Sequence, residues 1–312
     1  MIYLLFFIIL LVSELAYFKL ADHFNIIDKP NQRSSHSSIT LRGGGVVFYV
    51  GVMLYFLMND FQYPWFVGGL TLISMISFAD DVKPQSRRLR LVVHFSAMAL
   101  MFYQWGLFSE TWYFALIALV LCTGILNAYN FMDGINGITG GYSLVVAGSL
   151  WFINQSVGFV DSELIYFILL SLLVFNLFNF RKKAKCFAGD VGSISIAFIL
   201  IFLLGLLILK TGDFSYMILL VVYGVDSVLT IIHRLMLKEN IFEPHRKHLF
   251  QILANEVKLP HVLVSSIYLI LQGLIVVGFM CFKDYSWSYF GGILVVLVST
   301  YILLKKRFFH LH

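Results

Sequence analysis

The chain has 312 residues, of which 60% are apolar and only 12% are charged. A soluble domain is about 45–50% apolar and about 25% charged, so the composition excludes an ordinary soluble protein and predicts a polytopic integral membrane protein. The formal net charge of +5 does not indicate a nucleic-acid partner, because the basic residues stand in short segments between apolar runs.

Apolar runs follow one another along the whole chain. A membrane-spanning helix needs about 20 apolar residues, and about eleven runs approach that length, with ten spans as the alternative count. No repeat or separate polar domain interrupts them, which predicts an all-α protein with one transmembrane domain over residues 1–312. The predicted spans are residues 2–21, 44–59, 64–79, 91–108, 112–132, 138–156, 163–180, 191–210, 214–232, 261–282 and 287–304.

Five segments between these runs hold nearly all the polar chemistry: residues 28–45, 80–90, 127–136, 181–193 and 233–258. Lysines and arginines concentrate in four of them and in the carboxy-terminal tail, whereas the alternate connections carry mainly acidic residues. The positive-inside rule therefore predicts that the amino terminus is outside and the carboxy terminus is cytoplasmic. All five segments then lie on the cytoplasmic side, which predicts one shared active site built from cytoplasmic loops.

The first polar segment contains Arg33, His36 and Arg42, followed by Gly43, Gly44 and Gly45 before a span. Glycines at a helix start let backbone N–H groups approach an anion, and the helix dipole adds to the attraction. The flanking cations favour phosphate binding over the alternative, a flexible turn into a helix.

Two adjacent carboxylates, Asp80 and Asp81, close the third predicted span. Adjacent carboxylates repel each other unless a cation or a proton lies between them. They suit Mg²⁺, which usually takes one or two carboxylates together with substrate phosphates, and one of them could also act as a base. The alternative is a solvated turn paired with the nearby arginines.

A row of amides and one carboxylate, Asn127, Asn130 and Asp133, recurs every three residues and shares one face if it is helical. Such a row could hydrogen-bond a base, a ribose or a sugar amide; the alternative is hydrogen bonding between spans. Further along, Asp190 stands between glycines at a helix start, where it could hold a metal or act as an N-cap.

The last polar segment contains His245, Arg246 and His248. The two histidines and the adjacent cation suit a diphosphate better than zinc, because a third zinc ligand is missing. The alternative is a solvated amphipathic loop. Asp226 lies upstream in an apolar run and is interpreted as a carboxylate that supports the site.

Taken together, these motifs resemble those of the polyprenyl-phosphate N-acetylhexosamine-1-phosphate transferase family, in the same order, from Asp28 to about Leu253. The resemblance implies a Mg²⁺-dependent (or Mn²⁺-dependent) glycosyl-1-phosphate transferase of the bacterial inner membrane. Such an enzyme moves a sugar phosphate from a UDP-N-acetylhexosamine to undecaprenyl phosphate on the cytoplasmic face and releases UMP. It uses membrane lipid and no nucleic acid, and it is compatible with a homodimer.

The resemblance also implies roles for individual positions. The implied catalytic residues are Asp80, Asp81, Asp190, His245 and His248, and among them Asp190 and Asp81 are the implied metal ligands. The expected substrate-binding positions are Arg33, His36, Arg42, Gly43, Gly44, Asn127, Asn130, Asp133, Phe187 and Arg246. Among these, Asn130 and Asp133 match positions near the nucleoside, and Phe187 matches one near the uracil.

Some positions depart from the family pattern: Ile39 and Leu41 replace frequent prolines, and Asn136 stands where Asp is common. The spacing of His245 and His248 differs from the histidine-rich cluster of the peptidoglycan branch, so the chain lies nearer the enzymes that start O-antigen, capsule or related glycans. The donor is then UDP-GlcNAc or a UDP-linked deoxy N-acetyl sugar. Two alternatives remain open: the phospho-MurNAc-pentapeptide translocase of that other branch, and a secondary transporter, whose site would lie near the bilayer midplane.

Overall fold

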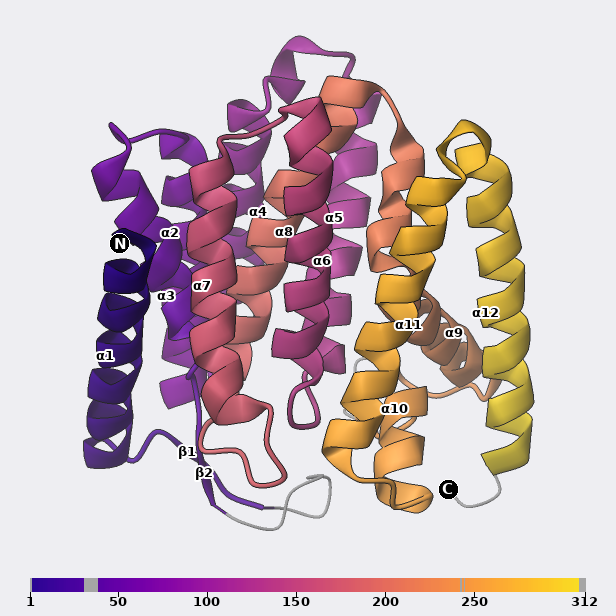
Figure 1. The fold of residues 1–312 in the computed structure, drawn as a ribbon. Coiled ribbons are helices and arrows are strands. Elements are labelled where there is room, and N and C mark those ends of the chain that lie inside the picture. Colours follow the sequence, from indigo (N-terminus) through magenta and orange to yellow (C-terminus); the bar gives the residue numbers. More distant parts are fainter. Residues whose placement is uncertain (1, 31–38, 242, 244, 309–312) are drawn as a thin grey trace.

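The computed structural model in Figure 1 describes residues 2–30, 39–241, 243 and 245–308, and in these ranges it is a helical bundle with one short two-stranded ribbon. The first half comprises α1 Ile2–His23, β1 Ile27–Asp28, β2 Thr40–Leu41, α2 Val46–Met58, α3 Pro64–Val82, α4 Arg87–Gln104, η1 Leu107–Ser109, α5 Trp112–Met132 and α6 Ile138–Val157. The second half comprises α7 Ser162–Asn179, α8 Gly189–Thr211, η2 Phe214–Leu220, α9 Val221–Met236, α10 Leu249–Gln251, η3 Ile252–Glu256, α11 His261–Cys281, η4 Lys283–Tyr285 and α12 Ser286–Phe308.

Each predicted span coincides with one helix, the ninth being formed by η2 and α9 together. Within the described ranges, eight helices are long and apolar enough to cross a membrane, which confirms the all-α membrane class. The helix ends differ from the prediction. The helix α3 runs on to Val82, α4 begins at Arg87 after the N-cap Ser86, and α8 begins at Gly189. Asp80, Asp81 and Asp190 therefore lie in terminal helical turns, not in loops.

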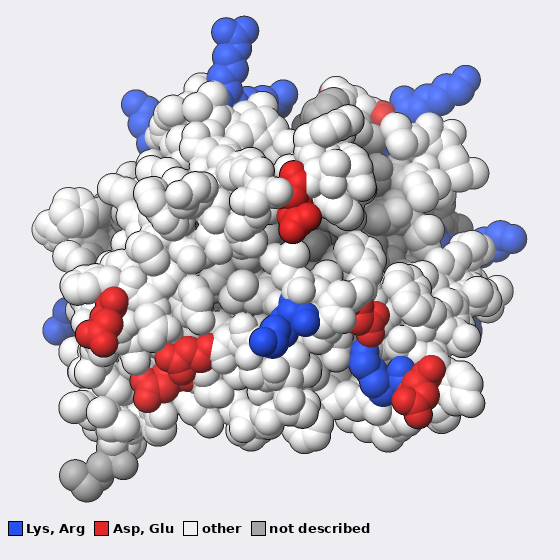
Figure 2. Space-filling model, turned by 90° about the horizontal axis from the view of Figure 1, so that it is seen from above, with Lys and Arg blue, Asp and Glu red and all other residues white. Residues whose placement is uncertain are grey.

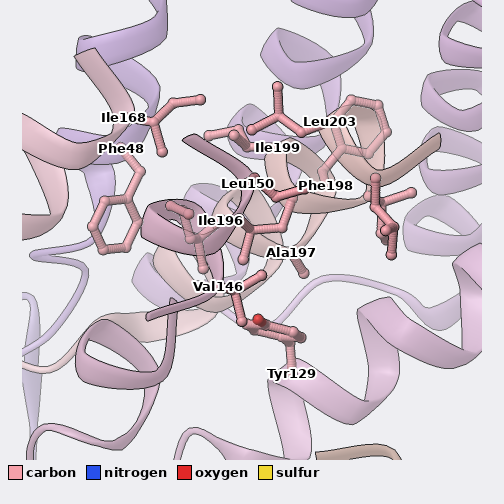
Figure 3. Close-up of a cluster of buried hydrophobic side chains, with 14 of the residues drawn as sticks. Phe48, Tyr129, Val146, Leu150, Ile168, Ile196, Ala197, Phe198, Ile199 and Leu203 are labelled. Atoms are coloured by element: carbon pink, nitrogen blue, oxygen red, sulfur yellow. The ribbon is translucent and has the colours of Figure 1, made fainter. Parts of the chain in front are cut away.

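The centre of the bundle is α8. Its sequence is apolar on all sides, as expected for a helix surrounded by other helices. It packs against α2, α3, α5, α6 and η2. Figure 3 shows Ile196, Ala197 and Ile199 of this helix among side chains from its neighbours, including Phe48 of α2 and Leu150 of α6. Because α8 is enclosed, its amino-terminal turn is held at a fixed place where the surrounding helices end.

The polar connections gather at one end of the bundle. Figure 1 shows β1, β2, α10 and the loop after α7 at the lower end, together with the carboxy terminus. The upper end, seen in Figure 2, is mostly uncharged; acidic side chains lie apart on its face, and most of the basic side chains in view project from its rim. The charge asymmetry of the sequence thus corresponds to two different ends of the molecule.

The ninth span changes direction between η2 and α9. Such a break leaves backbone groups without the partners that a continuous helix would give them. Gln272 of α11 bridges the break: its Nε2 donates to the carbonyl of Ile218 at 3.0 Å, and its Oε1 accepts from the amide of Val222 at 3.3 Å. Inside a membrane such groups must be satisfied by the protein. The buried glutamine therefore permits α9 to turn away from the axis of η2.

Two glycines bring the first polar segment against the start of α8. A methyl group on Gly45 would lie 2.2 Å from the Cα of Gly192, although the φ of Gly45 is an ordinary −68°. Glycine is needed here for close approach of two backbones and not for an unusual backbone conformation.

We expect Gly45→Ala to destabilise the protein by about 1–3 kcal/mol, as overpacking of a tight contact does. The measurement is thermal unfolding in detergent. The control is Gly148→Ala in α6, where an added methyl group meets nothing within 4 Å. Equal unfolding temperatures for the two variants would contradict the close contact.

Candidate active site

The site is organised around Asp81, whose side chain is fully buried. Its Oδ1 accepts from the amide of Asp190 at 2.9 Å and from Arg42 Nε at 2.7 Å, and its Oδ2 accepts from the amide of Val191 at 2.9 Å. The first amides of a helix have no partner within the helix. Asp81 supplies partners to two of them, and thereby joins α3 to α8.

The carboxylate of Asp190 remains partly accessible, with 17% of its side chain exposed. Its Oδ1 accepts from Arg42 and from Asn130 Nδ2, both at 3.2 Å, and its Oδ2 lies 3.5 Å from Arg90. Asn130 also lies 3.3 Å from the hydroxyl of Ser193. The start of α8 thus carries a carboxylate surrounded by donors from three other elements.

Asp80 completes the group. Its Oδ1 accepts from the amide of Gln85 at 2.7 Å, its Oδ2 accepts from Arg90 at 2.7 Å, and 11% of the side chain is exposed. Arg90 therefore bridges Asp80 and Asp190, as Arg42 bridges Asp81 and Asp190. Two guanidinium groups accompany three carboxylates, which leaves a net negative charge in this group.

In the sequence, Arg90 is one of the arginines near the Asp80–Asp81 pair and part of the charge asymmetry, and it was not predicted to be a site residue. Its role depends on the turn between α3 and α4, which brings the first turn of one helix beside the last turn of the other. No local pattern encodes that contact. An arginine three residues into an amphipathic helix that follows a carboxylate pair is the only hint in the sequence.

The three predicted residues at the end of α5, Asn127, Asn130 and Asp133, have different surroundings in the structure. Asn130 faces Asp190, but Asn127 is exposed and donates to the carbonyl of Thr123 at 3.0 Å on its own helix. Asp133 ends the helix and accepts from the hydroxyl of Thr139 at 2.7 Å. The structure therefore joins Asn130 to the carboxylate group and leaves Asn127 outside it.

Part of the first polar segment packs against the loop that follows α7. The amides of Gly44 and Gly45 donate to the carbonyls of Phe187 and Ala188, at 2.9 and 3.1 Å. These two N–H groups are used in protein packing and do not face an anion, contrary to what was expected of Gly44. Gly43 has a φ of +84°, which glycine adopts without strain. The predicted residues Arg33 and His36 lie outside the described residues.

Phe187 is half-buried, and its amide donates to the carbonyl of Leu41 at 2.8 Å. This bond, with the bridge between Leu41 and Cys186, ties the loop after α7 to β2. Asn136 is buried away from the carboxylates and donates to the carbonyls of Arg181 and Lys182. Asn136 therefore holds two loops together.

His245 and His248 lie side by side with ring centroids 5.0 Å apart, although the segment between them is not helical. Both contact Phe131, the neighbour of Asn130, with centroid distances of 6.5 and 6.2 Å. Burial, and then the nearby His248 and Arg234, lower the pKa of His245 to about 3, so this imidazole is neutral at physiological pH. Arg246 lies 3.7 Å from Glu256.

An apolar cavity of about 670 Å³ lies between α5, η2, α9 and α12. Most of its lining is aliphatic or aromatic, including Val120, Val228 and Leu294, and its few polar residues include Asn127, Arg234 and His245. Because His245 and Phe131 both line it, the cavity leads to the histidine pair and to the end of α5. This shape suits a long apolar group with a polar head.

Comparisons with known proteins find similar sequences. Residues 63–208 match the model of a family described as "Glycosyl transferase family 4". This range includes Asp80, Asp81, Asn130 and Asp190. The chain is 26% identical over 253 residues (74% of this chain, 70% of the relative) to the "Probable undecaprenyl-phosphate N-acetylglucosaminyl 1-phosphate transferase" of Bacillus subtilis.

Two further relatives are named "Undecaprenyl-phosphate alpha-N-acetylglucosaminyl 1-phosphate transferase". That of Yersinia pestis is 28% identical over 206 residues, 60% of this chain and 56% of the relative. That of Escherichia coli K12 is 25% identical over 264 residues, 75% of this chain and 71% of the relative. The helical fold with a charged group at one end is that of an integral membrane protein. Part of the chain is similar to glycosyl transferase family 4, and the chain is also similar to these transferases.

The electrostatics of Asp133 give a pH prediction. Burial, with a further contribution from Asp190 and Asp81, raises the pKa of this carboxyl from 3.8 to about 7. A carboxyl that binds its proton more tightly in the folded state contributes stability below its unfolded pKa and loses it as the pH rises through the folded pKa.

We therefore expect the unfolding temperature of the native chain, relative to Asp133→Asn, to fall by a few degrees as the pH rises from about 4 to about 7. Thermal unfolding of both proteins across this range is the measurement. A difference that does not change with pH, or that grows as the pH rises, would contradict the raised pKa.

Proposed function

We propose that this protein transfers N-acetylglucosamine 1-phosphate from UDP-N-acetylglucosamine to undecaprenyl phosphate and releases UMP. The names of the relatives supply the acceptor and the sugar. The observation that carries the proposal is the meeting of Asp80, Asp190, Arg42 and Arg90 at one end of the bundle. Asn130, which donates to Asp190, is followed by Phe131, which lines an apolar cavity. Phosphoryl transfer depends mainly on positioning and charge neutralisation, which this arrangement can supply.

The proposed reaction is a direct displacement. An oxygen of the acceptor phosphate attacks the phosphorus that carries the sugar, a new P–O–P bond forms, and the bond to the UMP oxygen breaks. Arg42 and Arg90 neutralise charge on the phosphates. Asp80 accepts the proton of a monoprotonated acceptor phosphate, because its side chain is 11% exposed whereas that of Asp81 is fully buried. Asp81 acts by holding Arg42 and the start of α8.

The residues present fit a magnesium ion bound with the substrate. Asp190 and Asp80 offer the hard oxygen ligands that Mg²⁺ prefers, and the net negative charge of the group favours a cation. The side chain of Asp81 is fully buried, whereas that of Asp80 is 11% exposed, so Asp80 replaces Asp81 in the proposed ligand pair. In the described residues, no three potential ligands surround one metal position. This agrees with an ion that takes its remaining ligands from phosphate and water. When bound, the ion would stabilise charge on the phosphates.

We further propose that this end of the bundle faces the cytoplasm of a bacterium, across its inner membrane. The basic segments and the carboxy-terminal helix with Lys305, Lys306 and Arg307 lie at the same end, which the positive-inside rule assigns to the cytoplasm. A cytosolic UDP-sugar then has direct access to the carboxylates, while the acceptor enters from the membrane.

The cavity between α5, α9 and α12 is the proposed site of the acceptor's prenyl chain. A prenyl chain that moves from lipid into this cavity gains free energy only if it packs better there than in lipid, because both surroundings are apolar. The main role of the cavity is therefore to align the acceptor phosphate with the carboxylate group. His245, at its polar end, is neutral and can accept or donate a hydrogen bond.

The reaction predicts that purified protein with undecaprenyl phosphate, Mg²⁺ and UDP-N-acetylglucosamine releases UMP in a lipid-dependent manner. We expect Asp80→Asn and Asp190→Asn to lose at least about 100-fold in rate with an unchanged fold, because each removes a charge that faces the phosphates. Asp81→Asn should lower the unfolding temperature as well, since it weakens the junction of α3 and α8.

A panel of UDP-N-acetyl sugars and a chelator complete that experiment. Activity with UDP-MurNAc-pentapeptide alone would move the protein to the peptidoglycan branch. Absence of UMP with every donor, from protein that unfolds cooperatively, would refute the proposed reaction.

Filling the cavity should impair use of the acceptor selectively. Gly224 of α9 lines the cavity, and a Cβ added there meets nothing within 4 Å. We expect Gly224→Phe to raise the KM for undecaprenyl phosphate about tenfold, equivalent to about 1.4 kcal/mol, with the KM for the UDP-sugar unchanged. The control is Gly148→Phe, which is equally open but does not line the cavity. An equal effect of both variants would contradict the assignment of the cavity.

A further inference from the structure

A second carboxylate centre lies in the interior of α9, away from the group around Asp190. Asp226 is only 3% exposed in an otherwise apolar span, where an ionised side chain is costly unless it has several partners. Five donors surround it: the amides of Leu249 and Phe250 at 3.0 and 3.4 Å, the hydroxyls of Tyr268 and Thr230 at 2.6 and 3.2 Å, and His248 Nδ1 at 3.3 Å.

These contacts join the histidine segment to the membrane helices. The amides of Leu249 and Phe250 are the first of α10 and would otherwise lack a partner. Tyr268 belongs to α11, and Thr230 is hydrogen-bonded in turn to Tyr301 of α12 at 2.8 Å. Asp226 thus fixes the start of α10 relative to three helices, and with it the backbone of His248.

The imidazole of His248 is oriented by the same carboxylate. Asp226 accepts four other hydrogen bonds, as an ionised carboxylate does. Its contact with Nδ1 is then a hydrogen bond in the tautomer that has the hydrogen on this nitrogen. The ring is 2% exposed and lies between Phe131, His245 and Phe250. Its other nitrogen, Nε2, is buried and finds no hydrogen-bond partner within the described part of the chain.

A buried polar atom without a partner costs about 1–3 kcal/mol, and in a native protein it calls for an explanation. Here the unpaired Nε2 belongs to a ring in contact with Phe131. The residue before Phe131 is Asn130, which donates a hydrogen bond to Asp190. The same Phe131 and the adjacent His245 line the cavity proposed for the acceptor. A phosphate beside His245 and Phe131 would satisfy this atom, because a phosphate oxygen accepts a hydrogen bond from Nε2 when the ring carries a proton there as well.

We propose that Asp226 is a positioning residue for phosphate transfer: by binding Nδ1 and the first amides of α10, it directs Nε2 of His248 towards the acceptor phosphate. This inference rests on the proposed function. Asp226 itself touches no substrate and acts only through His248.

The first test compares Asp226→Asn, His248→Gln and the double variant in the UMP assay. We expect each single variant to lose at least about tenfold in kcat, as loss of a carboxylate behind a functional histidine does, with the KM for the UDP-sugar unchanged. The double variant should be no slower than His248→Gln alone, because residues that act as a unit are not additive. Additive losses would overturn the proposal.

The matched control is Tyr268→Phe. It removes one hydrogen bond from the same buried cluster, but the bond is to Oδ2 of Asp226, whereas His248 contacts Oδ1. We expect it to lower the unfolding temperature and to leave kcat within about threefold of the native value. A loss as large as that of Asp226→Asn would show that general stability of the cluster, and not orientation of the ring, limits the rate.

A second measurement does not depend on turnover. In protein labelled with nitrogen-15 at histidine, with His248→Gln used for assignment, the Nδ1 of His248 should carry a proton in the native chain. Addition of farnesyl phosphate, a short prenyl phosphate, should shift the signal of Nε2 and leave Nδ1 bonded. An unprotonated Nδ1, or no response of Nε2 to the ligand, would overturn the proposal.

The two measurements separate the inference from the proposed reaction. If the native chain releases no UMP from any donor, the proposed function fails, and the histidine signals still report whether Asp226 orients the ring. If UMP is released and the signals or the variant rates disagree with the expectation, only the role of Asp226 fails.

Discussion

The hydrogen bonds from Asp81 to the start of α8 are the contacts on which the rest of the site depends. This carboxylate is buried, satisfies two amides of the central helix and holds Arg42 in place. Removal of one partner from a buried charged group leaves the other uncompensated, which is far more costly than loss of a surface ion pair. The position of Asp190, and therefore of the whole charged group, follows from this one junction.

Small residues make that junction possible. Gly45 and Gly192 let the first polar segment and α8 approach until their backbones are in contact, and Gly189 leaves room for the carboxylate of Asp81. In the sequence Gly43, Gly44 and Gly45 suggested a cradle for phosphate, whereas in the structure the amides of Gly44 and Gly45 bond to carbonyls of the loop after α7. The same residue types serve both purposes, because both require backbone that is free of side chains. Only the partner distinguishes them, and the partner is distant in sequence.

The protein has two buried carboxylates that work in the same way at different places. Asp81 binds the first amides of α8 and an arginine, and Asp226 binds the first amides of α10 and a histidine. Each fixes the position of a helix start and thereby of a functional side chain, Asp190 in one case and His248 in the other. Between them stands the end of α5, where Asn130 faces the first centre and Phe131 the second. The proposed transfer would take place between these two helix starts, beside the end of α5.

The sequence by itself determined the membrane class, the approximate place of the long helices and the set of polar segments that meet at one end. It could do so because hydrophobicity over about 20 residues is a local property, and because the cost of charge in lipid confines ionisable residues to helix ends. Only the tertiary structure decided which carboxylate is buried and which is accessible, that Arg90 contacts Asp80 and Asp190, and that Asn127 does not face them. Those assignments depend on contacts such as Asp80 with Arg90 and Asp190 with Arg42, between helices whose packing no local pattern specifies.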